Sequence, residues 1–277
     1  MNIAMIDDNM LDADRLDKSY LDRGLYFGDG VYEVLRSYNG KLFVLDEHLE
    51  RFKNSLAGIE ISGVDVNEIR GRVRKAFDAA KIPDAKIYFH VTRGSALREH
   101  NPQLNIKPNF FLTVSDVGDS SKSKTKGISV STYPDLRWKK CSIKSLNLLP
   151  NVLAKMDAAK KGCDEAILVD EQGLITEGSS SAFFACINGS IHTAPTTANI
   201  LPSITRKYII KAAGLLGIPV AEKSITPQQA KNADELFLGV TTKDIVPVVK
   251  FDDSIISNAR PGPITKKLIS EFIKFTQ

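Results

Sequence analysis

A strongly polar segment, GDSSKSKTKG at residues 118–127, divides the chain into two parts. It contains no apolar side chain that could join a core, and its Ser/Lys/Gly composition is typical of a linker. The whole chain of 277 residues also exceeds the usual size of one domain. We therefore predict an N-terminal domain at residues 1–117, an interdomain linker at 118–127 and a C-terminal domain at 128–277.

The first part alternates strand and helix patterns. Apolar residues recur every three or four positions at 46–59 and 64–81, which predicts two amphipathic helices. Strand-like runs occupy residues 41–45, 86–93 and 110–117. This combination predicts a small α+β domain.

The second part is denser in strand patterns. Runs rich in β-branched and aromatic residues predict strands at 128–132, 165–170, 173–177, 182–187, 190–194, 219–224, 235–239 and 244–251. Helical periodicity is found at 151–162, 203–217 and 264–275. We expect a larger, mostly β domain with helices packed outside.

Charge and targeting patterns exclude several classes of protein. Lys and Arg exceed Asp and Glu by four (37 against 33) without a long basic run, so no nucleic-acid partner is expected, whereas a small anionic ligand remains open. The N-terminus is acidic and polar, unlike a signal peptide, and no window is apolar enough for a membrane span. Three cysteines without metal spacing indicate reduced thiols. We expect a cytoplasmic protein.

Several catalytic motifs are absent from the sequence. We find no GxSxG, no GxGxxG after a strand and no GxxxxGK[ST], which disfavours a serine hydrolase, a dinucleotide enzyme and a P-loop nucleotidase. The four histidines are scattered without the spacing of metal ligands, so no metal site is expected.

Lys144, in CSIKSLNLLPN, is the first candidate for chemistry. A lysine amine becomes nucleophilic when burial or nearby cations lower its pKa, and it can then form a Schiff base with a carbonyl compound. A lysine at the end of a strand is, however, far more often a solvated charge. Other residues must decide between these interpretations.

Three further segments could form a site with Lys144. In TEGSSSAFF, Glu177 lies at a turn of small residues and could face a cationic ring nitrogen, or could be exposed in a hairpin. In ILPSITR, Ser203 begins a helix whose N-terminus could bind phosphate, or is a plain N-cap. In VTRGSALREHNP, Arg98 and His100 could hold a carboxylate, or be solvated loop charges.

Five stretches, in order along the chain, resemble the fold-type IV pyridoxal-phosphate enzymes. They are DRGLYFGDGVYEVLRSYNGKLFVLDEHLERF, IKSLNLLPNVLAK, GCDEAILVDEQGLITEGSSSAFF, ILPSITR and DELFLGVTTKDIVPV. The resemblance implies an α+β fold with a small N-terminal α/β domain and a larger, mostly β, barrel-like domain that binds pyridoxal 5′-phosphate, with peripheral helices. FGDGVYEV and the RxH pattern at Arg98 are most similar to D-amino acid aminotransferase within this group.

The resemblance also implies a role for individual residues. Lys144 would form the Schiff base, Glu177 would pair with the pyridine nitrogen, and Arg51 would bind the phosphate. The full implied set of cofactor-binding residues is Arg51, Lys144, Glu177, Leu201, Ile204, Thr205 and Thr241. Tyr32, Arg98 and His100 would hold the substrate carboxylate, the last two reaching across from the second subunit of a homodimer.

The activity implied is transamination between a D-amino acid, such as D-alanine or D-glutamate, and a 2-oxo acid such as 2-oxoglutarate or pyruvate. Branched-chain L-amino acid aminotransferase and aminodeoxychorismate lyase share the fold and remain alternatives, as does a non-catalytic anion-binding module. The chain departs from the group at three positions. Ala182 replaces the usual Asn, Ser142 replaces Asp, and Pro150 replaces Gly.

Overall fold

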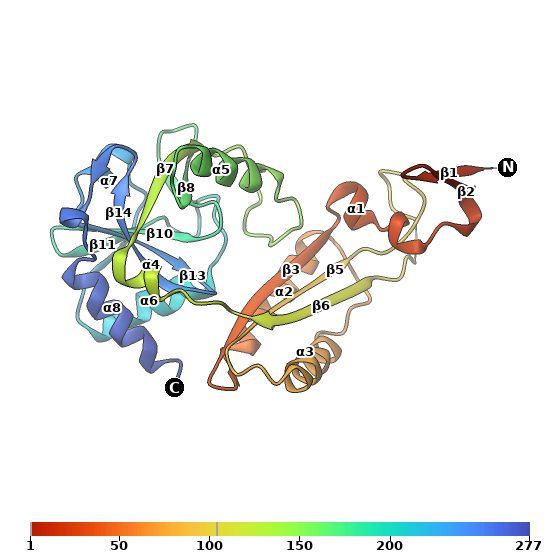
Figure 1. Cartoon of the computed structure of the whole chain (residues 1–277), viewed down its shortest axis with the longest axis horizontal. Coiled ribbons are helices and arrows are strands. Elements are labelled where there is room, and N and C mark those ends of the chain that lie inside the picture. The colour runs from red at the N-terminus through yellow and green to blue at the C-terminus, as the bar shows by residue number, and fades with distance from the viewer. Residues whose placement is uncertain (1, 104) are drawn as a thin grey trace.

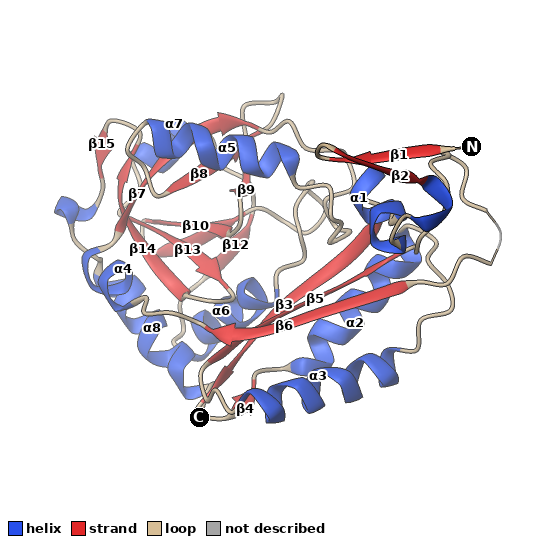
Figure 2. Cartoon of the chain, turned by 45° about the vertical axis from the view of Figure 1, so that its right-hand side comes forward, coloured by secondary structure: helices blue, strands red, loops and turns tan. Residues whose placement is uncertain are grey.

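The computed structural model describes residues 2–103 and 105–277, which form a two-stranded, a four-stranded and a nine-stranded sheet, and the two larger sheets lie side by side (Figure 1). In these residues no helix combines the length and the apolar character needed to cross a bilayer. The N-terminal part of the chain, up to the end of β6 at Asp116, forms a slender body that contains the two smaller sheets, whereas the rest forms a rounder body around the nine-stranded sheet (Figures 1 and 2).

The smaller sheet is antiparallel, with the strand order β4-β3-β5-β6. Its strands are β3 (Gly30–Tyr38), β4 (Lys41–Leu42), β5 (Ala85–Thr92) and β6 (Asn109–Asp116). Helices α2 (Leu45–Gly58) and α3 (Val66–Ala80) cover one face and bury a core that includes Phe52, Phe77 and Phe89. Both predicted helices are therefore confirmed within one or two residues.

The strand predicted at 41–45 is wrong beyond Leu42. Val44 adopts a left-handed backbone (φ 45°) as the N-cap residue of α2, and this conformation ends the pairing with β3. The apolar residues Phe43 and Leu45 instead face other elements, since Phe43 packs against Tyr208 and Leu45 enters the core of the smaller sheet.

Residues before the smaller sheet form an outlying hairpin and three short helices (Figure 2). These elements are β1 (Ile3–Ile6), β2 (Asn9–Asp12), η1 (Ala13–Arg15), η2 (Lys18–Leu21) and α1 (Arg23–Phe27). Ile3, Met5 and Met10 of the hairpin are exposed, so this end of the chain has an uncovered apolar surface.

The larger sheet has nine strands and curls upon itself, with the order β12-β11-β10-β13-β14-β7-β8-β9 and β15 paired to β14 (Figure 2). The strands are β7 (Ile128–Pro134), β8 (Glu165–Val169), β9 (Ile175–Gly178), β10 (Ala182–Ile187), β11 (Ser190–Thr193), β12 (Val220–Glu222), β13 (Glu235–Val240), β14 (Asp244–Phe251) and β15 (Ser254–Ile255). The helices around it are α5 (Leu149–Lys160), α6 (Ile204–Leu215), α7 (Pro227–Lys231), η3 (Ser257–Ala259) and α8 (Pro263–Lys274). The predicted mostly β fold with outer helices is confirmed.

The strand predicted at 173–177 begins later than expected. The backbone N–H groups of Gln172 and Leu174 donate to the Asp170 carboxylate, so residues 170–173 form a turn and β9 starts at Ile175. The hydrogen-bonding capacity of a short aspartate side chain favours such turns.

The polar segment 118–127 contains one short helix, α4 (Ser121–Lys126), which packs on β14 before the chain enters β7. Gly127 ends it with a positive φ (75°) and an extended ψ (176°), a conformation that is open to glycine because it has no Cβ. The segment thus connects the two sheets in a defined conformation.

Candidate active site

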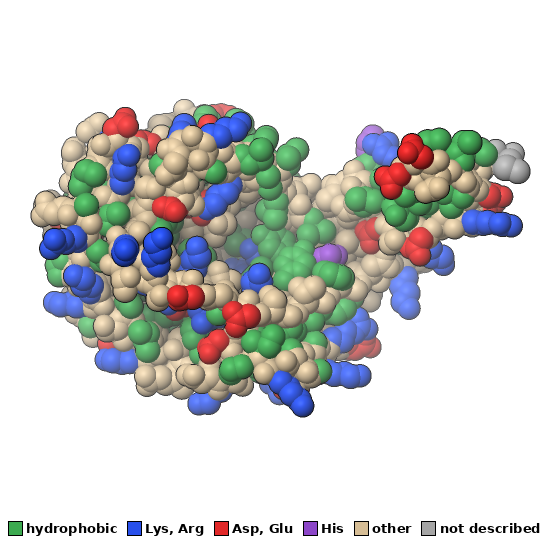
Figure 3. Space-filling view, in the orientation of Figure 1, with side chains coloured by type: hydrophobic (Ala, Val, Ile, Leu, Met, Phe, Trp, Pro, Cys, Tyr) green, Lys and Arg blue, Asp and Glu red, His purple; other side chains and the backbone are tan. Residues whose placement is uncertain are grey.

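A cavity of about 660 Å³ lies between the two sheets and collects most of the candidate residues. Its walls come from β3, from the loop before α5, from the turn between β9 and β10, and from the residues that precede α6 and follow β13. Figure 3 shows apolar side chains gathered in the hollow between the two bodies. Polar and charged groups stand among them, which is typical of a small-molecule site.

Lys144 lies in the loop before α5, and this loop is fixed against β3. The backbone N–H of Tyr32 donates to the Lys144 carbonyl (2.9 Å), and the Lys144 N–H donates to Ser55 Oγ (3.1 Å). The Lys144 ammonium group stands 4.2 Å from the centroid of the Tyr32 ring, and both side chains line the cavity. A cation above an aromatic face is held electrostatically, so the amine has a defined position.

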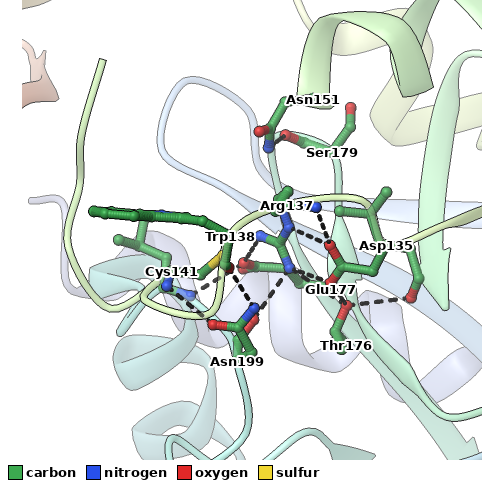
Figure 4. Close-up of polar contacts among 11 residues, drawn as sticks. Asp135, Arg137, Trp138, Cys141, Asn151, Thr176, Glu177, Ser179 and Asn199 are labelled. Atoms are coloured by element: carbon green, nitrogen blue, oxygen red, sulfur yellow. Dashed lines mark hydrogen bonds and ion pairs between the residues drawn. The ribbon is translucent and has the colours of Figure 1, made fainter. Parts of the chain in front are cut away.

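Glu177, at the end of β9, is buried and also lines the cavity, in an ion pair with Arg137 (Figure 4). Its Oε1 accepts from Arg137 Nη1 (2.5 Å) and from the backbone N–H of Leu201 (3.1 Å). Within the described residues Oε2 has no hydrogen-bond partner, which leaves an acceptor at the cavity. Burial raises the pKa of Glu177, and the Arg137 guanidinium opposes this shift.

Arg137 is itself held by Asp135, whose carboxylate accepts from Nε (2.8 Å) and Nη2 (2.7 Å). The carbonyl of Asn199 accepts from the same Nη2 (3.1 Å). The Asn199 side chain also accepts from the Cys141 N–H and donates to the Trp138 carbonyl (Figure 4). One network therefore fixes both Glu177 and the loop that leads to Lys144.

Arg51, from α2, lies at another wall of the cavity with its charge balanced by a buried carboxylate. Its Nε and Nη2 donate to the two oxygens of Glu33 (both 2.7 Å), and Nη1 donates to the Pro202 carbonyl (3.1 Å). His48 Nδ1 contacts the same carboxylate (2.7 Å). A guanidinium has five N–H donors, so two remain for a ligand.

Ser203 is the N-cap of α6, as one of the two interpretations of ILPSITR predicted. Its Oγ accepts from the Arg206 N–H (3.2 Å). Leu201, Ser203 and Thr241 line the cavity, whereas Ile204 and Thr205 are buried in the first turn of the helix and are not among the lining residues. The first N–H groups of a helix have no carbonyl partner within it and favour a bound anion.

The serine turn after Glu177 is held by a buried glutamate from β8. Glu165 accepts from the hydroxyl groups of Ser179 and Ser180, and the Ser179 carbonyl accepts from the Asn151 side chain (2.8 Å). In contrast, Ser181 Oγ is buried and has no partner among the described residues. A bound group could supply the missing hydrogen bond at this wall.

Arg98 and His100 do not line this cavity. They are exposed in the loop after β5 and both approach the Phe27 ring, with the Arg98 Cζ at 5.2 Å and the His100 ring centroid at 5.5 Å. Arg23 fixes the loop by donating to the carbonyls of Glu99 (2.6 Å) and His100 (3.1 Å). Within one subunit, therefore, only Tyr32 of the three carboxylate candidates meets Lys144.

The three departures have different surroundings. Ala182 is buried, lines the cavity and pairs with Gly239, so the wall there is apolar and close to the backbone. Ser142 is exposed in the turn before Lys144. Pro150 lies in the first turn of α5, where a missing N–H breaks no helical hydrogen bond.

Sequence reasoning missed Glu33, Arg137 and Asn199. Glu33 carried a usable signal, because a carboxylate within the apolar run GVYEVL must have a partner if that strand is buried. Arg137 and Asn199 carried none for their role at the site, since Arg137 reaches Glu177 across 40 positions and Asn199 contacts the backbone of Trp138 and Cys141 across about 60.

Comparisons with known proteins identify the family to which the chain belongs. The family model described as amino-transferase class IV matches residues 30–251. The chain is 39% identical to D-alanine aminotransferase of Bacillus licheniformis, over 89% of this chain and 87% of that protein. It is 38% identical to D-alanine aminotransferase of Staphylococcus haemolyticus, over 100% of this chain and 99% of that protein. The branched-chain amino acid aminotransferase from Escherichia coli superposes on this chain with a TM-score of 0.84 at 25% identity, over 96% of this chain and 90% of that protein.

Proposed function

The chain belongs to the class IV aminotransferases, and we propose that it transfers the amino group of a D-amino acid, such as D-alanine or D-glutamate, to a 2-oxo acid such as 2-oxoglutarate or pyruvate. The observation that carries the proposal is one cavity that holds an amine, Lys144, and a buried carboxylate, Glu177, on different walls. The identity of 38–39% to D-alanine aminotransferases over most of the chain supports the D-amino acid as donor.

The residues of the cavity fit pyridoxal 5′-phosphate, the cofactor of this family. We propose that Glu177 Oε2, which has no partner among the described residues, faces the ring nitrogen, and that Leu201 packs on the ring. Arg51, with two N–H groups to spare, would hold the phosphate together with the first turn of α6 (Ile204 and Thr205) and Thr241. The hydroxyl of Ser181, buried without a partner in the described part of the chain, is a further group that a bound cofactor could satisfy.

When bound, the cofactor supplies a carbonyl that binds amines and a cationic ring that takes up electrons from the substrate Cα. We propose that Lys144 Nζ is the general base that removes the proton from that Cα and returns it on the cofactor side. The ring of Tyr32 beside the amine limits its position, and the Glu177 carboxylate stabilises a protonated ring nitrogen. Ala182 and Leu201 give this part of the cavity an apolar lining.

The substrate carboxylate would contact Tyr32, with Arg98 and His100 supplied by the second subunit of a homodimer. Two observations support this arrangement. Arg98 and His100 are exposed and held away from the cavity of their own subunit. Exposed apolar side chains, which a second copy could cover, lie on the hairpin and on α5. They are Ile3, Met5, Met10, Leu149, Val152, Leu153 and Met156.

The direct test is the activity of purified protein with D-alanine, L-leucine or aminodeoxychorismate, each with 2-oxoglutarate present. We expect pyruvate and glutamate from D-alanine, and little turnover of the others. Lys144→Ala should abolish turnover, and borohydride treatment should attach the cofactor to Lys144 of the wild-type protein only. Wild-type protein that traps no cofactor would instead support a non-catalytic binding module.

Mixed dimers test the contribution of the second subunit. Lys144→Ala and Arg98→Ala subunits, each nearly inactive alone at low D-alanine concentration, are unfolded together and refolded. If Arg98 reaches across the dimer, each mixed dimer regains one complete site, and random pairing restores about a quarter of the wild-type activity, since half of the dimers are mixed and each has one site. No recovery would place Arg98 in the site of its own subunit.

A further inference from the structure

A second polar cluster lies where the smaller sheet meets the larger one, beside the cavity. It consists of Arg36 and Tyr38 from β3, Lys124 from α4 and Asp244 at the start of β14, and we call it the junction cluster. Its members come from three separate parts of the chain. Arg36, Tyr38 and Asp244 are each less than a tenth exposed.

The carboxylate of Asp244 is the centre of the junction cluster. It accepts hydrogen bonds from the Tyr38 hydroxyl, from Arg36 Nη1 (3.3 Å) and from Lys124 Nζ (2.6 Å). The Arg36 guanidinium also lies 3.9 Å from the centroid of the Tyr38 ring. Burial and the neighbouring Asp244 raise the pKa of Tyr38, so its hydroxyl stays a donor.

Buried ionic groups are a weak source of stability, because desolvation offsets much of their attraction and apolar residues of similar volume often do as well. The hydrogen bonds of the junction cluster have a more specific effect: each has a narrow range of distance and direction, so together they fix the relative positions of the elements that they join. The role of the cluster therefore depends on which element it fixes.

It holds the turn between β13 and β14, residues 241–243. Arg36 Nη1 donates to the Thr242 carbonyl (3.2 Å) as well as to Asp244. Asp244 has a left-handed backbone (φ 60°) and pairs with Val240, which closes the turn. Thr241 and Thr242 line the cavity, so the turn is a wall of the site with its outer side tied to β3.

The same strand connects the turn to the reacting end of the cavity. Side chains alternate along a strand, so Tyr32, Val34, Arg36 and Tyr38 lie on one face of β3. Tyr32 and Val34 line the cavity, and Arg36 and Tyr38 continue the row into the junction cluster. A shift of the turn relative to β3 would change the distance between Thr241 and the Lys144 end of the site.

We propose that Arg36 and Asp244, assisted by Lys124, are positioning residues that fix the Thr241–Thr242 turn against β3 and thereby set the affinity of the site for its cofactor and substrate. The inference rests on the proposed function, in which Thr241 contacts the cofactor phosphate. It assigns a role to the connecting segment as well, because Lys124 of α4 neutralises the second oxygen of Asp244.

The test compares Arg36→Met, Asp244→Asn and Lys124→Met with the wild-type protein. Met keeps an unbranched apolar stem in place of the longer, charged side chain, and Asn keeps both the shape of Asp and its tolerance of a left-handed backbone. The measurements are the Kd of pyridoxal 5′-phosphate for the apo-protein by absorbance titration, KM and kcat for D-alanine, and the Tm of the apo-protein.

We expect Arg36→Met and Asp244→Asn to raise both Kd and KM by about tenfold, with a smaller change in kcat. Arg36→Met removes the donor that ties the Thr242 carbonyl to β3, and Asp244→Asn leaves the buried Arg36 without its charged partner. Lys124 is partly exposed, so its loss should raise Kd by only about threefold. The matched control is Lys161→Met, which removes an equally long side chain from an exposed pair with Asp157 and should change neither constant.

A lower Tm with Kd and KM unchanged would overturn the proposal, since it would show that the junction cluster only stabilises the fold. If Arg36→Met fails to fold, the other two variants carry the same test. Wild-type apo-protein that binds no pyridoxal 5′-phosphate would refute the proposed function instead, so the two failures are distinguishable.

Discussion

The buried ion pair between Glu33 and Arg51 allows a quantitative prediction about stability. Glu33 is fully buried, and its two oxygens contact Arg51 Nε, Arg51 Nη2 and His48 Nδ1, all at 2.7 Å. Burial alone would raise the pKa of Glu33, but Arg51 and His48 outweigh it and lower the pKa from 4.5 to about 2. The folded state therefore favours the charged form of Glu33 more strongly than the unfolded chain does.

Glu33→Gln should lower the free energy of unfolding of the apo-protein by about 3 kcal/mol at pH 7. A pKa difference of this size, at about 1.4 kcal/mol per pH unit, gives a value close to 3 kcal/mol, and the loss of one partner from a buried ion pair typically costs about 3–5 kcal/mol. The assay is urea unfolding followed by circular dichroism. Glu68→Gln is the control, because its exposed pair with Arg72 should contribute less than about 1 kcal/mol.

The pH dependence of this difference has a defined sign. A carboxylate whose pKa is lowered by folding makes its full contribution to the free energy of unfolding at pH values above its pKa in the unfolded chain. This contribution is lost as the pH falls towards the pKa of the group in the folded protein. Between pH 7 and pH 4 the gap between wild type and Glu33→Gln should therefore narrow by about 1 kcal/mol. A gap that stays constant or widens on acidification would refute the assignment of a charged, ion-paired Glu33.

Two other predictions test parts of the structure outside the cavity. Gly262→Ala should lower the free energy of unfolding by about 1–3 kcal/mol, because the new methyl group would collide with the Glu235 carboxylate that caps the start of α8. Thermal unfolding of the variant and the wild-type protein will measure this loss of stability. Burial raises the pKa of both Cys141 and Cys186 to about 11. At pH 8, iodoacetamide should therefore label the less buried Cys163 first, as followed by mass spectrometry. Earlier labelling of Cys141 would contradict this prediction.

Much of the fold could be predicted from the sequence because local pattern and tertiary environment agree. The strand at 182–187 matches its prediction at both ends, since its side chains are nearly all buried and its apolar run is continuous. The helix at 46–59 was found because one of its faces packs on the smaller sheet. The short helix α4 within 118–127 was not predicted, because its polar sequence has no apolar face. It is held by the Lys124 ion pair and by the surface of β14.

The site was less predictable, since its polar residues are buried by partners distant in sequence. Glu177 could have been exposed in a hairpin, and it is buried because Arg137 and the Leu201 N–H compensate its charge. Neither partner has a local pattern that points to it. The roles of Lys144 and Arg51 followed from a resemblance, whereas the partners that fix them come only from the three-dimensional arrangement.

Strand β3 contributes to the cavity from both of its faces. On one face, Glu33 orients Arg51 from α2, and on the other face Tyr32 contacts Lys144 and Arg36 holds the Thr242 carbonyl. A one-residue change of register would exchange these faces and remove all three contacts together. The polar residues within this apolar strand are thus interpretable as a set: each has a charged or carbonyl partner on a different element, and together they fix the walls of one cavity relative to a single strand.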